Sequence, residues 1–526
     1  MKQLPIGIST LSAIRENDMV YIDKTALILP MVQKQGRYFL SRPRRFGKSL
    51  LVDTFKQLFE GNKALFAGLA IEQQWDWSQT YPVIKLDFAD GHVRNRDELD
   101  QRLQQQLSDI RHDLKLPENQ ALDLAGNFSS LIRQAEQEYS AKVVILIDEY
   151  DKAILDNIEG PQQAAEIREG LKNFYSVMKA QDGSIQFIFM TGVTKFSKVS
   201  LFSGINHIQD ISLHSRYSTL CGYSQTELEQ GFADHLQNVD WQKLKHWYNG
   251  YHFCGEAVYN PYDILLFIDN DYRYRNYWFE SGNPSFLLKL FQHYRYFLPA
   301  LEQVEVGEEI LNSFDIEKID PITLLFQSGY LTIESSREKR ERWLYQLKVP
   351  NQEVRQALND HFINAYTEQL PSEKMPLQDR LYDCLFDGDL EGLQSLVTRL
   401  FAGIPWRNFT GNHLPESEGY YASVLYAFFA SLNAVVIPED ITNHGQADLT
   451  VILGNNTYVM EFKRDHSTDY QTQTPNPALE QLQQRGYAEK YGNTKQSNSS
   501  VKKVFEVGMI FNSHARNLVQ MDWREL

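Results

Sequence analysis

The sequence predicts an α/β protein of more than one domain, and three observations lead to this fold class. The first 220 residues alternate short apolar runs with longer helical patterns, as parallel βα units do. The last part of the chain gives the order helix, strand, strand, strand, helix, strand. A chain of 526 residues with 42% hydrophobic and 13% aromatic content is also long enough to bury several cores.

The first part contains four candidate strands, at residues 37–41, 82–88, 142–148 and 186–191. The third and fourth runs are almost continuously apolar, which suits central strands of a sheet covered on both faces. Helical patterns fill the gaps between the strands, at residues 48–59, 97–114 and 164–181. We therefore expect a mainly parallel sheet between layers of helices.

The rest of the chain is expected to form three further parts. The pattern turns mainly helical after residue 220. A hairpin (330–334 with 342–347) and helical runs at 351–369 and 376–385 follow it. The predicted domains are a core at 1–220, a helical subdomain at 221–330, a linking region at 331–400 and a C-terminal α/β domain at 401–526.

Composition favours a cytoplasmic protein. Its three cysteines, at 221, 254 and 384, lie far apart and form neither a disulfide framework nor a paired zinc motif. The N-terminus lacks the apolar run of a secretory signal, and no stretch approaches the ~18 apolar residues of a membrane span. We therefore expect no membrane partner.

The formal net charge of −16 lowers the expectation of nucleic-acid binding, because phosphate contacts need Lys and Arg. The acidity is uneven, however. Residues 401–526 hold 10 Lys/Arg against 13 Asp/Glu, a balance of only −3. A local basic groove in this region remains compatible with the net charge.

A strand, a loop and a helix meet at residues 37–55, in the order of a phosphate-binding P-loop. The loop and helix start read RPRRFGKSLLVDTF (42–55). Backbone N–H groups at the helix N-terminus would hold the phosphates of ATP, the lysine would reach the β/γ-phosphates, and the serine hydroxyl would bind Mg²⁺. The motif departs from GxxxxGK[ST] because Arg42 replaces the first glycine. The candidate nucleotide-binding residues are Arg44, Arg45, Phe46, Gly47, Lys48, Ser49 and Leu50.

A second motif, KVVILIDEYD (142–151), is an apolar strand that ends in two carboxylates, as a Walker B strand does. Asp148 would hold Mg²⁺ through water, and Glu149 would polarise the water that attacks the γ-phosphate. A buried strand with an acidic exit is the alternative interpretation. The two motifs together favour a nucleotide site, and they predict binding more firmly than hydrolysis.

Two groups of neighbouring residues are open between a catalytic and a structural role. Thr191, which ends the strand at 186–191, is placed where a sensor residue would contact the γ-phosphate, with Lys195 and Lys198 beyond it. A polar strand end is an equal alternative. Arg44 and Arg45 would neutralise phosphate or would be surface charges.

The stretch HGQADLTVILGNNTYVMEFKRD (444–465) predicts a β-hairpin with a second site. Side chains alternate between the faces of a strand, so Glu461 and Lys463 share one face, and strand pairing can bring Asp448 beside Glu461. Two carboxylates on adjacent strands make a hard-oxygen site for Mg²⁺, for which Mn²⁺ could substitute. Lys463 could activate a water or steady developing charge, as phosphodiester hydrolysis requires.

Helices on either side of the hairpin offer further site residues. Glu418, preferred over Glu416, would supply a third carboxylate metal ligand from the helix at 415–432, with Glu439 as a competitor. Gln481, on the helix at 476–491, could face the site and takes a catalytic role in this prediction. The alternative is a solvated hairpin in which Glu461 and Lys463 form a surface ion pair of little energetic value.

These residues together resemble a bacterial family of AAA-ATPase-like proteins with a C-terminal PD-(D/E)XK nuclease-superfamily domain. The matching segments include YIDKT (21–25), FLSRPRRFGKSL (39–50), VVILIDEYD (143–151), FMTGVTKFS (189–197), NGYHF (249–253) and the ADL…MEFKRD hairpin. The resemblance implies an ASCE-type P-loop ATPase related to STAND ATPases, a helical subdomain and a restriction-endonuclease-like domain. It also implies that Arg42 is a family variant, and it allows a homo-oligomer. A role in defence against phage or mobile elements is an expectation from this architecture alone.

The leading hypothesis is therefore an ATP-regulated, metal-dependent nuclease that cuts nucleic acid, with DNA preferred as the substrate. One rival is an ATP-binding switch whose C-terminal domain grips nucleic acid or a protein partner without cleaving it. Another rival is an active ATPase with a structural C-terminal domain. Metal affinity that depends on the carboxylates would distinguish the leading hypothesis from the first rival.

Overall fold

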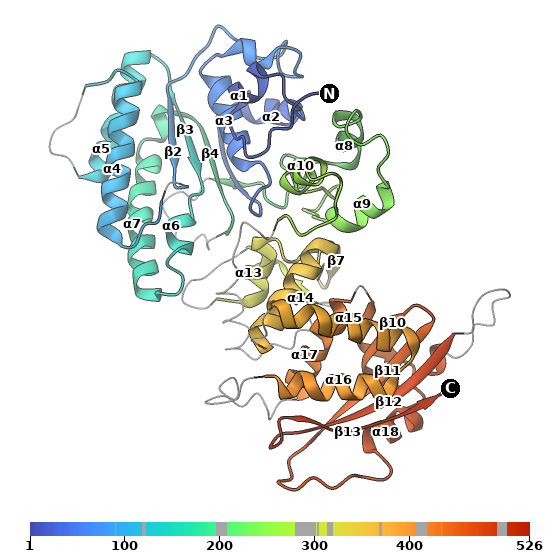
Figure 1. Ribbon diagram of the computed structural model, residues 1–526. Coiled ribbons are helices and arrows are strands. Elements are labelled where there is room, and N and C mark those ends of the chain that lie inside the picture. Colours follow the sequence, from blue (N-terminus) through green and yellow to red (C-terminus); the bar gives the residue numbers. More distant parts are fainter. Residues whose placement is uncertain are drawn as a thin grey trace. The chain divides into compact units, whose positions relative to one another are not determined.

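The computed structural model describes residues 1–89, 91–117, 123–195, 208–278, 301, 304–312, 319–367, 371–404, 418–432, 434–491 and 502–526. The chain divides into two compact units (Figure 1). The N-terminal unit contains residues 1–282 and 305–353, and the C-terminal unit contains residues 283–304 and 354–526. The four-part division predicted from the sequence stays a prediction.

The N-terminal unit is built on a five-stranded sheet in the order β2-β3-β4-β1-β5. All of the neighbouring strands in this sheet pair in parallel. Its strands are β1 (Gly36–Ser41), β2 (Val83–Asp87), β3 (Val143–Asp148), β4 (Ile185–Gly192) and β5 (Gln209–Asp210). Strands β3 and β4 are buried along almost their whole length. The predicted parallel sheet and its four main strands are therefore confirmed.

Helices cover both faces of this sheet. Figure 1 shows α4, α5 and α7 on one side and α1, α2 and α3 on the other. The helices of the core are α1 (Leu11–Glu16), α2 (Thr25–Val32), α3 (Lys48–Phe59), α4 (Arg96–Asp113), α5 (Leu124–Tyr139), α6 (Lys152–Leu155) and α7 (Pro161–Ala180), with short 3₁₀ turns at Lys63–Phe66 and Asp182–Ser184. This arrangement leaves the carboxyl ends of the parallel strands together at one edge, where the phosphate loop lies.

A small helical part follows the core, after a 3₁₀ turn at Ser215–Tyr217. Helices α8 (Gln225–Gly231), α9 (Trp241–Tyr248) and α10 (Pro261–Asp269) pack around aromatic and aliphatic side chains, and Val20 of the N-terminal segment joins this cluster. The unit ends with α12 (Glu308–Asn312), α13 (Pro321–Ser328) and a sheet in the order β6-β8-β7. The strands of that sheet are β6 (Val304–Gly307), β7 (Thr332–Lys339) and β8 (Arg342–Lys348).

The C-terminal unit contains a second five-stranded sheet, in the order β13-β12-β11-β10-β9. Only the β11–β12 pair is parallel, and the other neighbours are antiparallel. The strands are β9 (Val435–Thr442), β10 (Gly445–Leu453), β11 (Asn456–Asp465), β12 (Lys503–Asn512) and β13 (Asn517–Glu525). The predicted hairpin is thus β10–β11, whereas β13 has no counterpart in the sequence prediction.

Helices lie on both faces of the C-terminal sheet. The helices from residue 352 onward are α14 (Gln352–Thr367), α15 (Pro371–Asp387), α16 (Leu390–Ala402), α17 (Glu418–Ala430) and α18 (Pro477–Arg485), with a 3₁₀ turn at Glu489–Tyr491, and α16, α17 and α18 contact the strands. On β12, Phe511 stacks on Tyr421 of α17, whereas Gly508 lies against Leu479 of α18. Residues 508 and 511 point to opposite faces of a strand, so α17 and α18 cover opposite faces.

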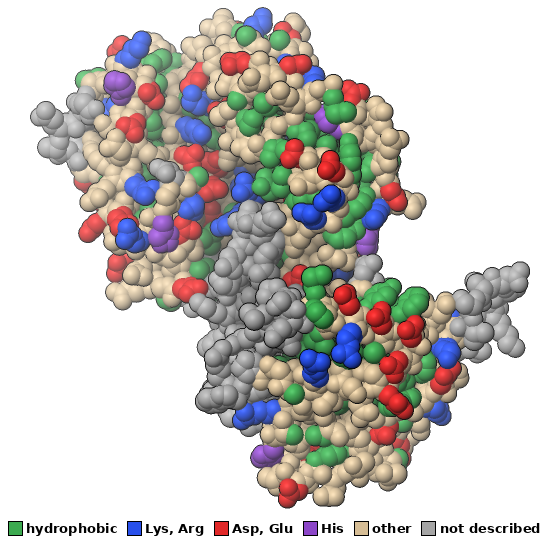
Figure 2. Space-filling model, in the orientation of Figure 1, with side chains coloured by type: hydrophobic (Ala, Val, Ile, Leu, Met, Phe, Trp, Pro, Cys, Tyr) green, Lys and Arg blue, Asp and Glu red, His purple; other side chains and the backbone are tan. Residues whose placement is uncertain are grey.

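The surface charges and the lengths of the apolar helices indicate which partners the protein could contact. On the face shown in Figure 2, acidic and basic side chains are intermingled over the N-terminal unit. Among the described residues, no helix combines the length and the apolar character that crossing a membrane requires.

Candidate functional site

The phosphate loop, residues 42–49, connects the buried strand β1 to helix α3. Helix α3 begins at Lys48, and the residue before it, Gly47, has φ of +88°. This left-handed conformation suits glycine because it has no Cβ. The first N–H groups of a helix have no partner within the helix, so the start of α3 at the end of this loop is an arrangement that can bind phosphate.

Lys48 is buried at the floor of the loop. Its Nζ donates hydrogen bonds to the carbonyl oxygens of Arg42 (3.1 Å) and Pro43 (2.9 Å). Burial lowers the pKa of Lys48, and the carboxylates of Asp148 and Glu149 act in the opposite direction. The ammonium group therefore lies between the loop and the end of β3, where phosphate would replace the two carbonyl oxygens as its partner.

Asp148 and Ser49 meet across the end of the sheet. A hydrogen bond from Ser49 to the Asp148 carboxyl lowers the pKa of this acid, but burial has the larger effect and raises it overall. Asp148 Oδ1 accepts the N–H of Glu149 at 3.0 Å, while the buried Oδ2 has no hydrogen-bond partner within the described residues. An unsatisfied carboxylate oxygen beside a serine hydroxyl fits the ligand set that Mg²⁺ prefers.

Glu149 follows Asp148 in a strained backbone conformation, with φ of +50°. Its side chain is half-buried and lines the same cavity as the phosphate loop. Burial raises its pKa, and Lys48 lowers it. A left-handed conformation is uncommon for a glutamate, and such strain is frequent at functional sites.

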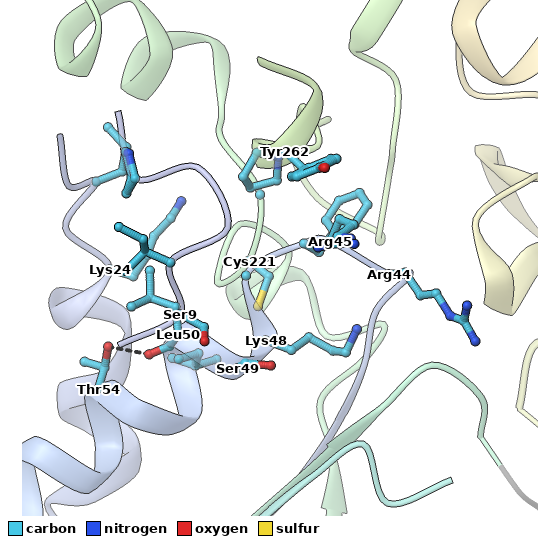
Figure 3. A pocket seen from close by; sticks show the side chains of 18 of the residues that line it. Ser9, Lys24, Arg44, Arg45, Lys48, Ser49, Leu50, Thr54, Cys221 and Tyr262 are labelled. Atoms are coloured by element: carbon cyan, nitrogen blue, oxygen red, sulfur yellow. Dashed lines mark hydrogen bonds between the residues drawn. The ribbon is translucent and has the colours of Figure 1, made fainter. Parts of the chain in front are cut away.

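The cavity beside the loop, called here the nucleotide pocket, has a volume of about 660 Å³. The cavity is lined by the segment before α2, the phosphate loop with α3, the residues that follow β2 and β3, and the helical part after the core. Figure 3 shows Lys48, Ser49 and Cys221 close together, with Tyr262 near Arg45 and Arg44 directed away from them. The volume lies in the range of small-molecule and cofactor sites.

Two contacts close the pocket from the helical part. The Arg45 guanidinium lies over the ring of Tyr262, at 4.6 Å from its centroid. Lys24, in the segment before α2, donates to both carboxylate oxygens of Glu227 at 2.6 Å. The pocket is therefore bridged by one cation–π contact and one ion pair, both between the core and the helices after it.

Tyr262 and Asp263 lie in the first turn of α10, which begins at Pro261. Asp263, the residue after the one that contacts Arg45, belongs to a buried pair of acids. Asp263 and Glu353 are both fully buried and hydrogen-bond each other. Glu353 Oε1 accepts the backbone N–H groups of Tyr277 and Trp278. Burial and the neighbouring acid hold the pKa of Asp263 well above its usual range, and burial raises the pKa of Glu353 to about 7.

Arg42 stands where the common P-loop pattern has glycine, and its side chain points away from the pocket. It is 1% exposed, donates to the carbonyl oxygens of Ser41, Ser212 and Tyr217, and lies 3.9 Å from the ring centroid of Phe253. Burial lowers its pKa to about 10. The departure from the motif is therefore a structural contact behind the loop rather than a phosphate contact.

The other residues predicted for this site have contacts of their own in the structure. The Thr191 hydroxyl is buried and donates to the Leu40 carbonyl at 2.9 Å, so it already has a partner inside the sheet. Lys195 forms an ion pair with Asp210. Lys198 lies outside the described residues. Phe46 is buried against Tyr251, and Leu50 lines the pocket. The sensor role of Thr191 stays a prediction.

The second site lies on the hairpin of the C-terminal unit. Leu449 pairs with Met460, and this register sets Asp448 opposite Glu461. Asp448 Oδ2 accepts the N–H of Phe462 at 2.7 Å. The predicted neighbourhood of the two carboxylates follows from this register.

Lys463 and Gln481 both bind the same oxygen of Glu461. Lys463 Nζ donates to Glu461 Oε1 at 2.9 Å, and Gln481 Nε2 donates to it from α18. The other oxygen, Oε2, is buried without a hydrogen-bond partner in the described part of the chain. The structure therefore brings Asp448, Glu461, Lys463 and Gln481 together, as expected from the sequence.

Two partly buried carboxylates, Asp448 and Glu461, determine the electrostatics of this site. Burial raises the pKa of Glu461 to about 7 and that of Asp448 to about 6; the charge of Asp448 adds to the effect on Glu461, while Lys463 opposes it. Burial lowers the pKa of Lys463, but its hydrogen bond and attraction to Glu461 outweigh this and raise it overall. A bound cation would stabilise the ionised forms of these two carboxylates.

The candidates for a third carboxylate are less closely placed. Glu418 is exposed at the start of α17, and its charge acts on the pKa of both Asp448 and Glu461. Glu439 is exposed on the edge strand β9 and has a weaker effect on Asp448. Glu416 lies outside the described residues. Among the residues that the structure describes, no three His, Cys, Asp or Glu side chains form a metal-binding group.

Gly508 is a site residue that the sequence analysis missed. It pairs with Glu461 on the neighbouring strand, and a Cβ at this position would overlap the backbone of Leu479. Helix α18 can therefore approach the sheet closely enough for Gln481 to reach Glu461. A glycine in the run FEVGMIF (505–511) was the available signal, because glycine inside a strand often marks a close approach of another backbone.

Both sites now define a class of protein: a P-loop ATPase-like domain in a chain that ends in a nuclease-superfamily fold. Residues 5–202 match a family model described as a predicted AAA-ATPase, and residues 416–521 match one described as the PD-(D/E)XK nuclease superfamily. The chain is 44% identical over 491 residues to an Azotobacter chroococcum mcd 1 protein described as an uncharacterized protein in the vnfD 5' region. That alignment covers 93% of this chain and 94% of the relative. The chain thus belongs to the family of AAA-ATPase-like proteins that carry a C-terminal PD-(D/E)XK domain.

Proposed function

We propose that the chain is an ATP-controlled, Mg²⁺-dependent nuclease that cuts nucleic acid, with DNA as the first substrate to test. One observation supports cleavage most directly: Glu461 keeps a buried, unpartnered oxygen beside Asp448 in the described part of the chain, while Lys463 and Gln481 hold its other oxygen. A buried carboxylate oxygen without a donor is costly unless a cation or a water completes it.

In this proposal Asp448 and Glu461 hold a divalent cation, and Glu418 contributes negative charge from α17. A cation bound there would supply Lewis-acid charge to a phosphodiester oxygen. Lys463 keeps its proton at Nζ and faces the same region, where it can orient a water or steady developing negative charge. Gln481 is a positioning residue, because it fixes the carboxylate plane of Glu461 from α18.

The nucleotide pocket has the matching set for ATP. Lys48 would exchange two loop carbonyls for phosphate oxygens, and Ser49 and Asp148 are the residues that would hold the magnesium ion of the nucleotide. Glu149 accepts the proton of the attacking water, as its position at the end of β3 and its raised pKa allow. Arg45 reaches phosphate only if it leaves the ring of Tyr262.

The movement of Arg45 from Tyr262 to phosphate offers a route by which ATP could control cleavage. Tyr262 is followed by Asp263, which hydrogen-bonds Glu353 in the first turn of α14, and α14 carries the chain into the C-terminal unit. A change at Arg45 can thus alter the start of a helix that continues into the nuclease unit. The route is a chain of contacts inside the N-terminal unit, and coupling along it is the part of the proposal that needs measurement.

The decisive experiment uses purified protein, a panel of DNA and RNA substrates, and Mg²⁺ or Mn²⁺ with and without ATP. Wild type should cut at least one substrate, and Glu461→Ala should cut none while retaining its fold and its ATP affinity. Tyr262→Leu should keep metal-dependent cutting but lose its dependence on ATP. Equal cutting by wild type and Glu461→Ala would assign the activity to a contaminant and refute the proposal.

A second candidate is an ATP-binding switch that grips nucleic acid or a protein without cleaving it. Two observations favour it: the formal charge of −16, and the lack of a three-ligand metal group among the described residues. Calorimetric titration with Mg²⁺ separates the candidates. In the absence of nucleotide, the nuclease should have a Mg²⁺ site that Asp448→Ala and Glu461→Ala each abolish. In the switch, these two substitutions should leave Mg²⁺ binding unchanged.

A further inference from the structure

The hairpin β7–β8 ends in an exposed group of basic side chains, the ribbon tip, residues 337–342, with the sequence REKRER. Every residue of the tip is exposed. Four of its six residues are Lys or Arg, in a chain whose formal net charge is −16. This local excess of positive charge is opposite in sign to the balance of the whole chain.

Strand register places three of these cations on one face. Arg337 pairs with Leu344, and Lys339 pairs with Arg342. Residues directly opposite in a hairpin share a face, so Arg337, Lys339 and Arg342 lie together. Glu338 pairs with Trp343 and therefore takes the other face. The acidic residue between the cations is thereby separated from them.

Within the described residues, only one of these cations is neutralised by a neighbour. Arg337 forms an ion pair with Glu305 of β6. The side chains of Lys339, Arg340 and Arg342 make no hydrogen bond or ion pair in the described ranges. Like charges directly opposite in a hairpin are destabilising, so the pair of Lys339 and Arg342 works against the strand pairing that holds it.

The turn itself is also locally unfavourable. Arg340 and Glu341 have φ of +53° and +61°, the left-handed conformation that two-residue hairpin turns prefer to fill with Asn-Gly. A hairpin that served only to close the sheet would gain stability from Asn-Gly at the turn and from an acid at position 339 or 342. Local choices that oppose the fold are expected at functional positions.

We propose that the ribbon tip is a second nucleic-acid contact, on the N-terminal unit, in which Lys339, Arg340 and Arg342 bind backbone phosphates. The contact is independent of sequence, because exposed Lys and Arg recognise phosphate charge. The choice of nucleic acid among polyanions rests on the proposed function of the C-terminal unit. The contact requires no cleavage, no metal and no nucleotide.

The test compares two variants of the full-length chain that lose the same charge. The ribbon variant is Lys339→Gln, Arg340→Gln and Arg342→Gln. The control variant is Lys63→Gln, Arg133→Gln and Lys179→Gln, which removes three exposed cations elsewhere in the N-terminal unit. Binding to a labelled duplex of ~30 base pairs is measured by fluorescence anisotropy in EDTA, over about 50 to about 200 mM salt.

Each phosphate contact contributes about 0.9 to the slope of log K against log salt. The ribbon variant should therefore lose roughly 2 to 3 from this slope and bind at least about tenfold more weakly at the lowest salt. The control variant should bind as wild type does. Circular dichroism and ATP affinity verify that the ribbon variant is folded.

Three results would overturn the assignment. Equal affinity and slope in wild type and the ribbon variant would refute the contact while leaving the nuclease proposal intact. Equal losses in the ribbon and control variants would reduce it to an effect of net charge. Ribbon-dependent binding to vesicles of phosphatidylserine and phosphatidylcholine, with no binding of the duplex, would assign the tip to a membrane surface instead.

Discussion

Replacing Asp263 by Asn should make the stability of the N-terminal unit less sensitive to a rise in pH from the acidic range toward neutrality. Asp263 and Glu353 are fully buried and hydrogen-bond each other, and burial raises the pKa of both acids. The amide introduced by Asp263→Asn would keep a donor toward Glu353 but could not ionise. The titratable groups around the pair are the hydroxyls of Tyr248 and Tyr251, which are neutral in this range, and within the described residues no basic side chain contributes to either shift.

The sign of the effect follows from proton linkage. A buried acid with a raised pKa retains a proton in the folded state that the unfolded chain releases near pH 4. The free energy of unfolding therefore falls as pH rises, by about 1.4 kcal/mol per pH unit for each proton retained. Asp263→Asn removes one such proton, so its stability relative to wild type should rise by about 1.4 kcal/mol per pH unit above about pH 4, over the range in which Asp263 keeps its proton in the folded state.

Urea unfolding of the whole chain, followed by tryptophan fluorescence at several pH values, measures this difference. Asp269→Asn is the matched control, because Asp269 is exposed at the other end of the same helix, α10. The control gives the effect of replacing an exposed aspartate of this helix by asparagine, against which the pH dependence of Asp263→Asn is compared. A stability difference between Asp263→Asn and wild type that stays constant with pH would show that the pair retains no proton, and the electrostatic reasoning would be wrong.

Three further substitutions test separate contacts. Gly508→Ala should destabilise the C-terminal unit by about 1–3 kcal/mol in thermal unfolding, because its Cβ overlaps the backbone of Leu479, and it should weaken metal-dependent cutting through the displacement of α18. Arg42→Met should cost about 3 kcal/mol or more in urea unfolding, since three carbonyl oxygens lose their donor. Thr191→Val should cost about 1 kcal/mol and leave the rate of ATP hydrolysis unchanged, because the hydroxyl already donates to Leu40.

For each of these three predictions, one experimental outcome would contradict it. Wild-type melting and cutting by Gly508→Ala would mean that α18 can shift without affecting Glu461. If Arg42→Met unfolded like wild type but bound ATP poorly, Arg42 would act on the nucleotide rather than behind the loop. A loss of ATP hydrolysis by Thr191→Val at wild-type stability would support the sensor role predicted from the sequence.

Periodicity was sufficient to predict the elements that carry both sites. The buried runs at β3 and β4 and the amphipathic pattern of α3 each have a local signal, and the predicted and observed bounds of α3 coincide at residues 48–59. The face shared by Glu461 and Lys463 followed in the same way from the alternation of side chains along β11.

The features that were missed depend on contacts between distant segments. Nothing local indicates that Arg42 turns toward Phe253, or that Gly508 admits the backbone of α18. The burial of Asp263 with Glu353 joins residues that are far apart in the chain and have no shared pattern. The interaction of Thr191 could not be predicted from its position. The end of a strand suggested a nucleotide contact, whereas its hydroxyl donates to the carbonyl of Leu40 in the neighbouring strand.

The contacts of Arg42 behind the phosphate loop also limit which substitutions this position can accept during evolution. Replacing it with the glycine of the common signature would leave three carbonyl oxygens and the face of Phe253 without their partner. Reversion toward the consensus would therefore be harmful on its own, and it would become neutral only after compensating changes near Phe253. Positions 42 and 253 are thus expected to be inherited as a pair, and a search pattern that demands glycine at the first position would overlook chains of this kind.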